Sequence, residues 1–414
     1  MNRILIKTVY AEHVNRMSKP KITLLAALVA ASFSSQAEVE LGGSTAFEGR
    51  YFLQDAAYPG QPRTQVSVAI EPEAYTEWND GQDSLLFRPF ARLDNRDDER
   101  THWDIRELQW LHVADEWESR VGIGKVFWGQ TESLHLVDII NQTDMVEHVD
   151  GEDKLGQPMV NFTTYGDWGT ASAYILPYFR ERTFPGMDGR LRPPIPIVSD
   201  RAQYESDAEQ NHIDYALRYQ NSFGAYEVGL SYFNGTTREP ELSVAQDDIT
   251  NPFVVPYYAQ IQQFGVDLLK VQGAWLLKFE GIYREGQSED FAAAVAGFER
   301  TTVGVLGTNH DLGFLMEYQY DERENNFFST GQNDLMAGVR WSFNDIDGTE
   351  VLAGFVQDLD EASTYNAFLE ASSRITDSWR WKVDAYLFSS DDNMDTFFFM
   401  RRDDHLQVTL EYFF

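Results

Sequence analysis

Apolar and polar residues alternate along much of the chain, in segments of about ten residues that recur up to the C-terminal end. In residues 65–78, for example, Val66, Val68 and Ile70 are each separated by a more polar or smaller neighbour. Further clear examples are residues 212–219, 379–388 and 406–414. A period of two places successive side chains on opposite faces of a β-strand. The pattern therefore predicts strands with one apolar and one polar face.

The connections between these segments alternate in length. The short ones are residues 79–84, 114–117, 166–169, 221–224, 268–273, 307–311, 344–348 and 374–378. The more polar and usually longer ones are residues 53–63, 95–101, 129–157, 180–211, 235–256, 286–291, 321–334, 358–363 and 389–405. Short turns on one side and longer loops on the other are typical of membrane barrels. We expect about 18 strands, with about 16 as the alternative.

Two segments give weaker strand signals. In residues 102–113 the alternation slips near Arg106 and Glu107, and residues 291–306 alternate poorly. Both are included among the 18 expected strands.

A soluble β-sandwich also alternates, and it is the main competing fold. Aromatic residues favour the membrane barrel, because Trp78, Tyr219, Trp379 and Phe414 stand at the ends of apolar faces. Membrane barrels place aromatic girdles at these positions. The opposite faces carry full charges, as a wet interior would. The predicted fold is all-β, a transmembrane antiparallel up-and-down barrel with short periplasmic turns and long extracellular loops.

Residues 1–37 read as a secretory signal peptide that is removed. Two lysines precede an apolar run from Ile22 to Phe33, and small residues close the segment at Ala37. This arrangement matches a basic start, a short apolar core and a cleavage site. The core is shorter than the roughly 20 apolar residues that a membrane-spanning helix needs. We expect residues 38–414 to form a single barrel domain.

These features together resemble Gram-negative outer-membrane β-barrel proteins of the porin-like kind. The resemblance rests on the signal peptide, the alternating strands and a last strand with alternate apolar residues that ends in Phe414. It implies a location in the cell outer membrane, surrounded by lipid and lipopolysaccharide. It also implies that the barrel-assembly machinery reads the segment ending in Phe414. A small solute would be the ligand, no cofactor is expected, and the chain would be a monomer or a trimer.

Composition excludes several other classes. The 414-residue chain has a formal charge of −33 and no cysteine. Nucleic-acid binding needs basic surface to replace phosphate counterions, so it is not expected of so acidic a chain. The lack of cysteine excludes a disulfide scaffold.

The polar faces give candidate residues that line the pore. Charges near the bilayer midplane cost about 2–4 kcal/mol on the lipid face, so they must point into the barrel. Opposed charges there can select solutes, as charged rings do in channels. The candidates on the wall are Glu71, Glu73, Arg88, Arg92 and Arg120.

The loop 129–157 is strongly acidic and long enough to need a functional or packing reason. We expect it to fold into the lumen as a constriction, with a short helix around 133–140, where apolar residues recur at helical spacing. Its candidate constriction residues are Glu132, His135, Asp138, Asp144, Glu147 and Asp150.

The next long loop, residues 180–211, is the basic segment of this acidic chain. Its five arginines are candidate constriction residues, namely Arg180, Arg182, Arg190, Arg192 and Arg201. Because consecutive long loops carry opposite charge, we expect this loop to meet the acidic one in or over the lumen.

Metal binding and catalysis are less favoured. Glu147, Asp150, Glu152 and Asp153 offer hard oxygen ligands for calcium but lack the spacing of a twelve-residue calcium loop. No G-x-S-x-G motif occurs, and nothing orients a histidine beside a nucleophile. The leading hypothesis is a passive channel that prefers cations. The alternatives are a receptor, adhesin or structural barrel with a plugged lumen and, more remotely, a barrel hydrolase.

Overall fold

The computed structural model describes residues 38–247, 252–323, 331–393 and 395–414. The predicted signal peptide, residues 1–37, lies outside the described residues. Among the described residues, no helix combines the length and apolar character needed to cross a bilayer.

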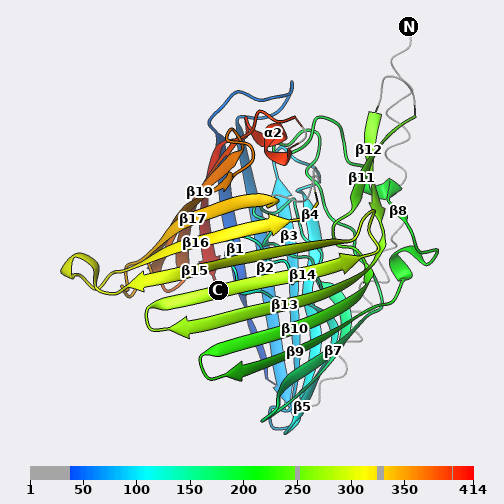
Figure 1. The fold of residues 1–414 in the computed structure, drawn as a ribbon, viewed down its shortest axis with the longest axis vertical. Coiled ribbons are helices and arrows are strands. Elements are labelled where there is room, and N and C mark those ends of the chain that lie inside the picture. Colours follow the sequence, from blue (N-terminus) through cyan, green and yellow to red (C-terminus); the bar gives the residue numbers. More distant parts are fainter. Residues whose placement is uncertain (1–37, 248–251, 324–330, 394) are drawn as a thin grey trace.

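An 18-stranded antiparallel sheet forms the body of the molecule (Figure 1). Its strands are β1 (Val39–Phe52), β2 (Thr64–Trp78), β3 (Asp83–Asp94), β4 (His102–Val113), β5 (Trp117–Gly124), β6 (Gln157–Gly166), β7 (Gly169–Leu176), β9 (Asp214–Phe223), β10 (Tyr226–Thr236), β13 (Gln260–Gln272), β14 (Trp275–Glu285), β15 (Phe291–Thr302), β16 (Asp311–Asp321), β17 (Asn333–Ser342), β18 (Glu350–Asp358), β19 (Tyr365–Thr376), β20 (Trp379–Ser389) and β21 (His405–Phe413).

The sheet closes on itself. Strand β1 pairs with β2 on one side and with the last strand, β21, on the other, in a register that runs from Ser44–Phe413 to Phe52–His405. Closure leaves no free edge, so every strand finds backbone partners within the barrel, as a spanning structure in lipid requires. The prediction of 18 strands is confirmed, and 16 is wrong.

The predicted alternation of short and long connections is also confirmed. The two weaker strands exist as β4 and β15, although β15 ends at Thr302 and the turn after it holds a short 3-10 helix, η3 (Val305–Gly307). The slip in alternation within β4 is a bulge. Glu107 pairs with Arg88 while Ile105 pairs with Pro89, so Arg106 has no partner residue on β3. Because Pro89 has no N–H to donate, the bulge forms where a ladder bond could not.

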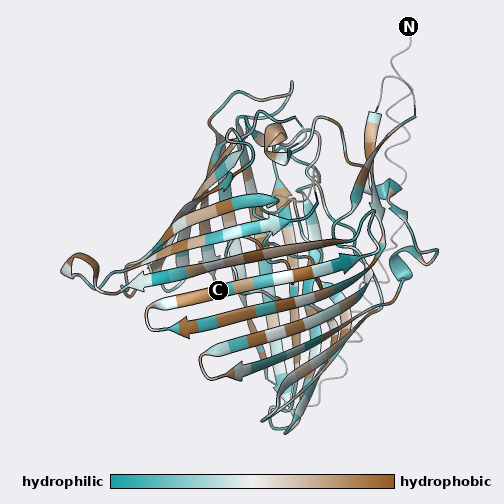
Figure 2. Cartoon of the chain, viewed as in Figure 1, coloured by the Kyte–Doolittle hydropathy of each residue, from teal (hydrophilic) through white to brown (hydrophobic). Residues whose placement is uncertain are grey.

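The two faces of the strands meet different surroundings. On β2, Val66, Val68 and Ile70 are 53%, 39% and 44% exposed, whereas Gln65 and Ser67 between them are only 3% and 2% exposed. Figure 2 shows apolar and polar residues interleaved along the strands. The apolar face points outward and the polar face inward, which is the reverse of a water-soluble sheet and suits a barrel in lipid.

Smaller elements lie in the long connections. Strands β8 (Gln203–Tyr204), β11 (Glu241–Gln246) and β12 (Pro252–Tyr258) form a separate three-stranded sheet. Helix α2 (Thr396–Met400) lies between β20 and β21, and the 3-10 helices η1 (Ser199–Arg201) and η2 (Glu209–Asn211) flank β8. In Figure 1, α2 and the β11–β12 hairpin both lie toward the top of the view.

The outward face makes a testable prediction about stability. Leu369 on β19 is 38% exposed on the apolar face, and its neighbour Glu370 is on the inner face. Leu369→Lys should lower the free energy of unfolding by about 2–4 kcal/mol, because the charge would face hydrocarbon. Denaturant unfolding of the barrel in lipid vesicles measures this. Glu370→Lys, which puts the same residue on the inner face of the same strand, is the control. Equal losses in the two variants would contradict the assignment of faces.

Candidate functional site: a constriction inside the barrel

Residues 125–156, which connect β5 to β6, cross the inside of the barrel. On one side they bind Glu280 of β14 and Glu317 of β16. On the other side they bind Arg92 of β3 and Arg106 of β4. These four strands lie on different sides of the closed sheet. We call this segment the inner loop.

Two buried glutamates of the wall bind the backbone of the inner loop. The Glu280 carboxylate accepts the N–H groups of Gln130 at 2.6 Å and Thr131 at 3.0 Å. Glu317 accepts the N–H of Ser133 at 2.8 Å. Both carboxylates are at most 1% exposed. Hydrogen bonds to charged groups contribute about 1.5–3 kcal/mol each, so this side is a strong anchor.

The glutamate anchor also requires a close approach of the chain. A Cβ atom at Gly129 would lie 2.8 Å from Nδ1 of His135 and 3.1 Å from Oε1 of Glu280. Such distances are too short for a side chain without displacement of these groups, so glycine lets the backbone reach the carboxylate.

The helix predicted around residues 133–140 is wrong. The structure has turns and irregular backbone there. The N–H groups just before this segment donate to Glu280 and Glu317 rather than taking part in a helix. Val137 and Ile140 are fully buried and join a core cluster that includes residues of the barrel wall. The apolar spacing therefore reflects burial against the wall rather than one face of a helix.

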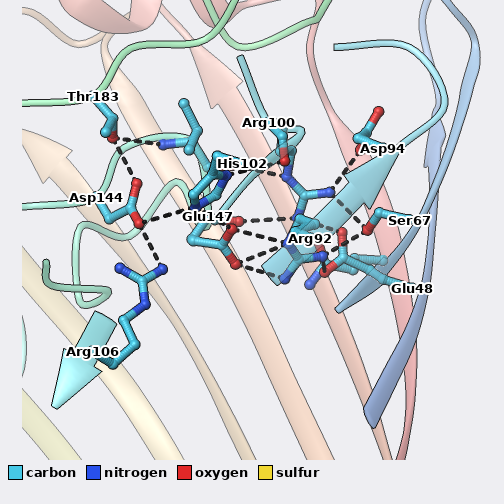
Figure 3. Close-up of polar contacts among 12 residues, drawn as sticks. Glu48, Ser67, Arg92, Asp94, Arg100, His102, Arg106, Asp144, Glu147 and Thr183 are labelled. Carbon is cyan, nitrogen blue, oxygen red and sulfur yellow. Dashed lines mark hydrogen bonds and ion pairs between the residues drawn. The ribbon is translucent and has the colours of Figure 1, made fainter. Parts of the chain in front are cut away.

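Guanidinium groups bind the opposite side of the inner loop (Figure 3). Arg92 donates to the Glu147 carboxylate at 2.6 Å, and Arg106 lies 2.7 Å from the Asp144 carboxylate. Arg50 donates to the backbone carbonyl of Glu147 at 2.8 Å. Arg100 donates to the carbonyl of Val146 at 2.8 Å. The loop thus presents its N–H groups to wall carboxylates and its oxygens to wall arginines.

Glu48 of β1 links the arginines to one another. Its carboxylate lies 2.7 Å from Arg100 and 3.2 Å from both Arg50 and Arg92. All four side chains are buried. Sequence reasoning missed Glu48, Arg50 and Arg100. The alternation could have identified Glu48 and Arg50, because the two residues lie on the same face of the strand-like segment 44–50.

His102, Asp144 and Glu147 form a compact group whose possible ligand atoms lie within 4.8 Å of one another. This is a geometry that could hold a metal ion. Arg106 and Arg92 already lie on the two carboxylates, so the negative charge that a cation would neutralise is met by protein. Burial would raise the pKa of Asp144, but its hydrogen bond with His102 and the charge of Arg106 hold that pKa far below its usual range.

The weak calcium candidates bind protein partners. Asp150 pairs with His148 at 2.7 Å, and Glu152 pairs with His135 at 3.1 Å. Glu147 pairs with Arg92, and the backbone carbonyl of Asp153 accepts the N–H of Asp144. The three ion pairs turn the carboxylates of Glu147, Asp150 and Glu152 toward separate neighbours instead of one centre.

The two remaining acidic candidates of the inner loop are also paired. Glu132 lies 2.7 Å from Arg340 of β17 and 3.5 Å from Lys278 of β14. Asp138 is buried and lies 3.4 Å from Lys154. Each of the five candidate carboxylates of this loop therefore has a cationic partner within the described residues.

The basic loop, residues 180–211, touches the inner loop through hydrogen bonds, and no ion pair joins the described residues of the two loops. Its Thr183 hydroxyl donates to Asp144 at 2.7 Å, and Arg182 donates to the Gln142 side chain at 3.3 Å. Arg180 donates to the carbonyl of Gly156 at 2.8 Å and also pairs with Asp104. The remaining arginines bind elsewhere: Arg190 to Asp403, Arg201 to Asp247, and Arg192 over the Tyr58 ring. Opposite charge between the loops is not what joins them, because the wall arginines already neutralise the acidic residues.

The candidate residues of the barrel wall that do not bind the inner loop form smaller ion-pair clusters with neighbouring wall residues. Arg88 pairs with Glu73, with Glu107 at 2.8 Å and with Glu71 at 3.7 Å. Arg120 pairs with Glu118 at 2.9 Å. The side chains of Arg88 and Arg120 are 34% and 40% exposed, so they border open space rather than the inner loop.

A cavity of about 560 Å³ lies between the inner loop and the opposite wall. His135, His148, Asp150 and Glu152 border it from the loop. The wall side is formed mainly by β18–β20, and α2 borders the cavity as well. The wall residues include Leu352, Val356, Asn366, Phe368, Glu370, Tyr386 and Phe388.

His135 connects the loop to both neighbouring carboxylates. Its ring nitrogens lie 3.1 Å from Glu152 and 4.0 Å from Glu280. Burial disfavours the charged imidazole, but the two negative charges outweigh burial and raise the pKa of His135 to about 10. The histidine is therefore protonated at neutral pH and adds a positive charge to the glutamate anchor.

Comparison with known proteins gives no family assignment from sequence. No protein-family model matches the chain, and no curated protein matches it significantly. Among solved structures, a BenF-like porin from Pseudomonas fluorescens Pf-5 is similar with a TM-score of 0.54 and 11% identity, over 92% of this chain and 99% of that chain.

Two further solved structures align over similar fractions of this chain and of their own chains. The OmpT loop L8 deletion variant, an outer membrane protein of Vibrio cholerae, has a TM-score of 0.45 and 11% identity, over 91% of this chain and 99% of that chain. A mutant of the Rh. blastica porin has a TM-score of 0.44 and 12% identity, over 91% of this chain and 100% of that chain.

The BenF-like porin shares the fold with this chain. Closed barrels with an outward apolar belt are the β-structures that cross outer membranes. The chain is therefore an outer-membrane β-barrel with a porin-like fold.

The glutamate anchor can be tested by substitution. Glu280→Gln removes the negative charge that accepts the N–H groups of Gln130 and Thr131. We expect amide hydrogen exchange in residues 129–137 to become about 10–100-fold faster, since a charged acceptor is lost. Mass spectrometry of peptides from the exchanged barrel measures this. Glu227→Gln, at an exposed position on β10, is the matched control. Unchanged exchange would show that Glu280 does not hold the loop.

The histidine of the anchor predicts a pH dependence. Because the folded-state pKa of His135 is raised from 6.5 to about 10, its stabilising effect is complete below pH 6.5 and is lost as the pH rises through about 10. Protease cleavage of the inner loop should stay slow at pH 7–8 and accelerate towards about pH 10. His135→Gln should remove this rise. A rise of the same size in the variant would assign the pH dependence to other groups.

Proposed function

We propose that the protein is a passive channel for small polar or charged solutes across the outer membrane. The observation that carries this proposal is the cavity between the inner loop and strands β18–β20. The inner loop crosses the lumen and leaves this space between itself and β18–β20. A solute passing through the barrel would have to pass beside the loop, which gives the loop the role of a constriction.

Passive transport requires a shaped, polar route and no turnover chemistry. The closed sheet satisfies its own backbone groups, so the lumen wall can carry charged side chains without breaking the barrel. The candidate carboxylates of the inner loop are held by ion pairs, either with wall residues, as Glu147 is with Arg92, or within the loop, as Asp138 is with Lys154. Side chains fixed in this way suit a constriction of constant width better than a catalytic centre. We therefore propose that the protein is not an enzyme.

We further propose that the channel prefers cations. The arginines next to the inner loop are neutralised by Glu48, Asp144 and Glu147. On the opposite wall, Glu370 and Asp384 face each other across β19 and β20, and their polar partners are neutral side chains, Tyr386 and Gln407. Uncompensated carboxylates beside a narrow passage favour cations, as rings of acidic side chains do in other channels.

The reversal potential tests both statements. In a planar bilayer with a tenfold KCl gradient, the purified barrel should carry a steady current whose zero-current voltage has the sign for potassium. The double variant Glu370→Gln with Asp384→Asn should move this voltage towards zero, because the uncompensated charge is gone. Glu40→Gln, at an exposed end of β1, is the control. Absence of current would refute the channel, whereas a voltage of the opposite sign would refute only the cation preference.

A further inference from the structure

We propose that the cavity beside the inner loop is a binding site for a small organic cation, namely a protonated amine with an apolar or aromatic body. This inference rests on the proposed channel function and names the class of solute that the channel would select. Three features of the cavity and its wall support it: the apolar side chains, the lining carboxylate of Glu370 with Asp384 as its cross-strand neighbour, and a buried amide oxygen without a hydrogen-bond partner among the described residues.

The wall of the cavity is apolar and aromatic over much of its area. Leu352 and Val356 of β18 and Phe368 of β19 line it next to each other. They belong to a packed cluster that includes the fully buried Met336. Phe388 and Phe397 border the same cavity from β20 and α2. A lumen wall that served only ions and water would have no need of these side chains, because they offer no hydrogen bonds to a hydrated solute.

Two carboxylates lie opposite each other on the inner face of this wall. Glu370 and Asp384 are direct cross-strand partners, an arrangement in which like charges destabilise a sheet. The neighbouring cations bind other groups: Lys382 lies 2.7 Å from Glu411, and His148 lies 2.7 Å from Asp150. His148 and Lys382 therefore act on the two carboxylates only from beyond ion-pair distance, and a cationic ligand could bind Glu370 directly.

Asn366 supplies a further acceptor. Its side-chain carbonyl oxygen is buried and accepts no hydrogen bond from the described residues, and Asn366 lines the same cavity. A buried polar atom without a partner carries a desolvation cost that a ligand donor can remove. On β19, Asn366, Phe368 and Glu370 alternate along one inner face, so an acceptor, an aromatic ring and a carboxylate stand in a row.

Cations of the protein also border the cavity, but their hydrogen bonds are already directed at protein acceptors. Arg50 and Arg100 bind Glu48 and the inner-loop backbone, and Arg190 binds Asp403 at 2.5 Å. An anionic ligand would have to break these pairs. A protonated amine would instead find acceptors without cationic partners, together with aromatic rings whose faces attract positive charge.

The size of the cavity agrees with this class of ligand. Its volume of about 560 Å³ lies within the range of roughly 300–1,000 Å³ of small-molecule sites. The lining is mixed. Apolar and aromatic side chains of β18–β20 and α2 stand next to polar and charged residues, which fits a ligand with one charged end and a hydrocarbon body.

Benzylammonium is the probe for the experiment, and three matched compounds report on its parts. Methylammonium lacks the body, benzyl alcohol lacks the charge, and benzoate reverses the charge. Binding to the detergent-solubilised barrel is measured by calorimetry, and block of the potassium current is measured in a planar bilayer. We expect benzylammonium to bind at least tenfold more tightly than each of the other three compounds and to block the current in the same concentration range.

Two variants separate the contributions of the site. Glu370→Gln should weaken benzylammonium binding at least tenfold and leave the weak binding of benzyl alcohol unchanged. Phe368→Leu keeps the wall apolar but removes the ring, and it should weaken benzylammonium more than methylammonium. Glu77→Gln, at an exposed end of β2, is the control. Folding of each variant is checked by its heat-dependent migration in electrophoresis, and Asp384→Asn replaces Glu370→Gln if the latter does not fold.

The outcomes distinguish this inference from the channel itself. Equal binding of benzyl alcohol or benzoate would overturn the cation site, even where a potassium current is present. Tight, Glu370-dependent binding without any current would support the site and refute the channel. A current with no selective binding of benzylammonium would leave the channel standing and refute the site.

Discussion

A charge buried inside the barrel must meet an opposite charge or a hydrogen-bond partner, and this constraint places the inner loop. Its backbone N–H groups bind Glu280 and Glu317, and its carboxylates bind Arg92 and Arg106. Removing one partner of a buried pair typically costs about 3–5 kcal/mol, because the other charge stays unpaired. The two walls thus hold the loop from opposite sides, and the remaining space in the lumen follows from where the loop lies.

The barrel makes such a network possible because its strands separate two environments. The outward face is largely apolar and meets lipid, so the charges in the middle of the strands are directed into a shared interior. There, residues from distant parts of the chain meet. Glu48 of β1 joins three arginines, and the bulge on β4 at Arg106, opposite Pro89, gives that strand a guanidinium group that reaches Asp144.

The sequence predicts the barrel well because strand faces repeat every two residues and turns differ from loops in length. The alternation identifies Glu280, Glu317, Glu370 and Asp384 as inward-facing residues. It does not say which of them bind the loop, because those contacts join residues far apart in the chain, such as Ser133 and Glu317. The helix predicted around residues 133–140 is wrong for the same reason. Apolar residues at helical spacing indicate burial, but the sequence does not show that strands of the barrel wall bury them.

The position of the cavity beside β18–β20 and the proposed preference for cations both follow from the charges of the inner loop and of the wall. The inner loop is acidic, so it is attracted to the guanidinium groups of β1, β3 and β4. The glutamates of β14 and β16 bind it too, but through backbone N–H groups instead of side chains. Strands β19 and β20 offer Glu370 and Asp384 instead. His148 of the loop pairs with Asp150, and its ring packs against Tyr386, which donates to Glu370. The proposed cation preference rests on this difference, because the loop carboxylates are paired with cations, whereas Glu370 and Asp384 form no ion pair among the described residues.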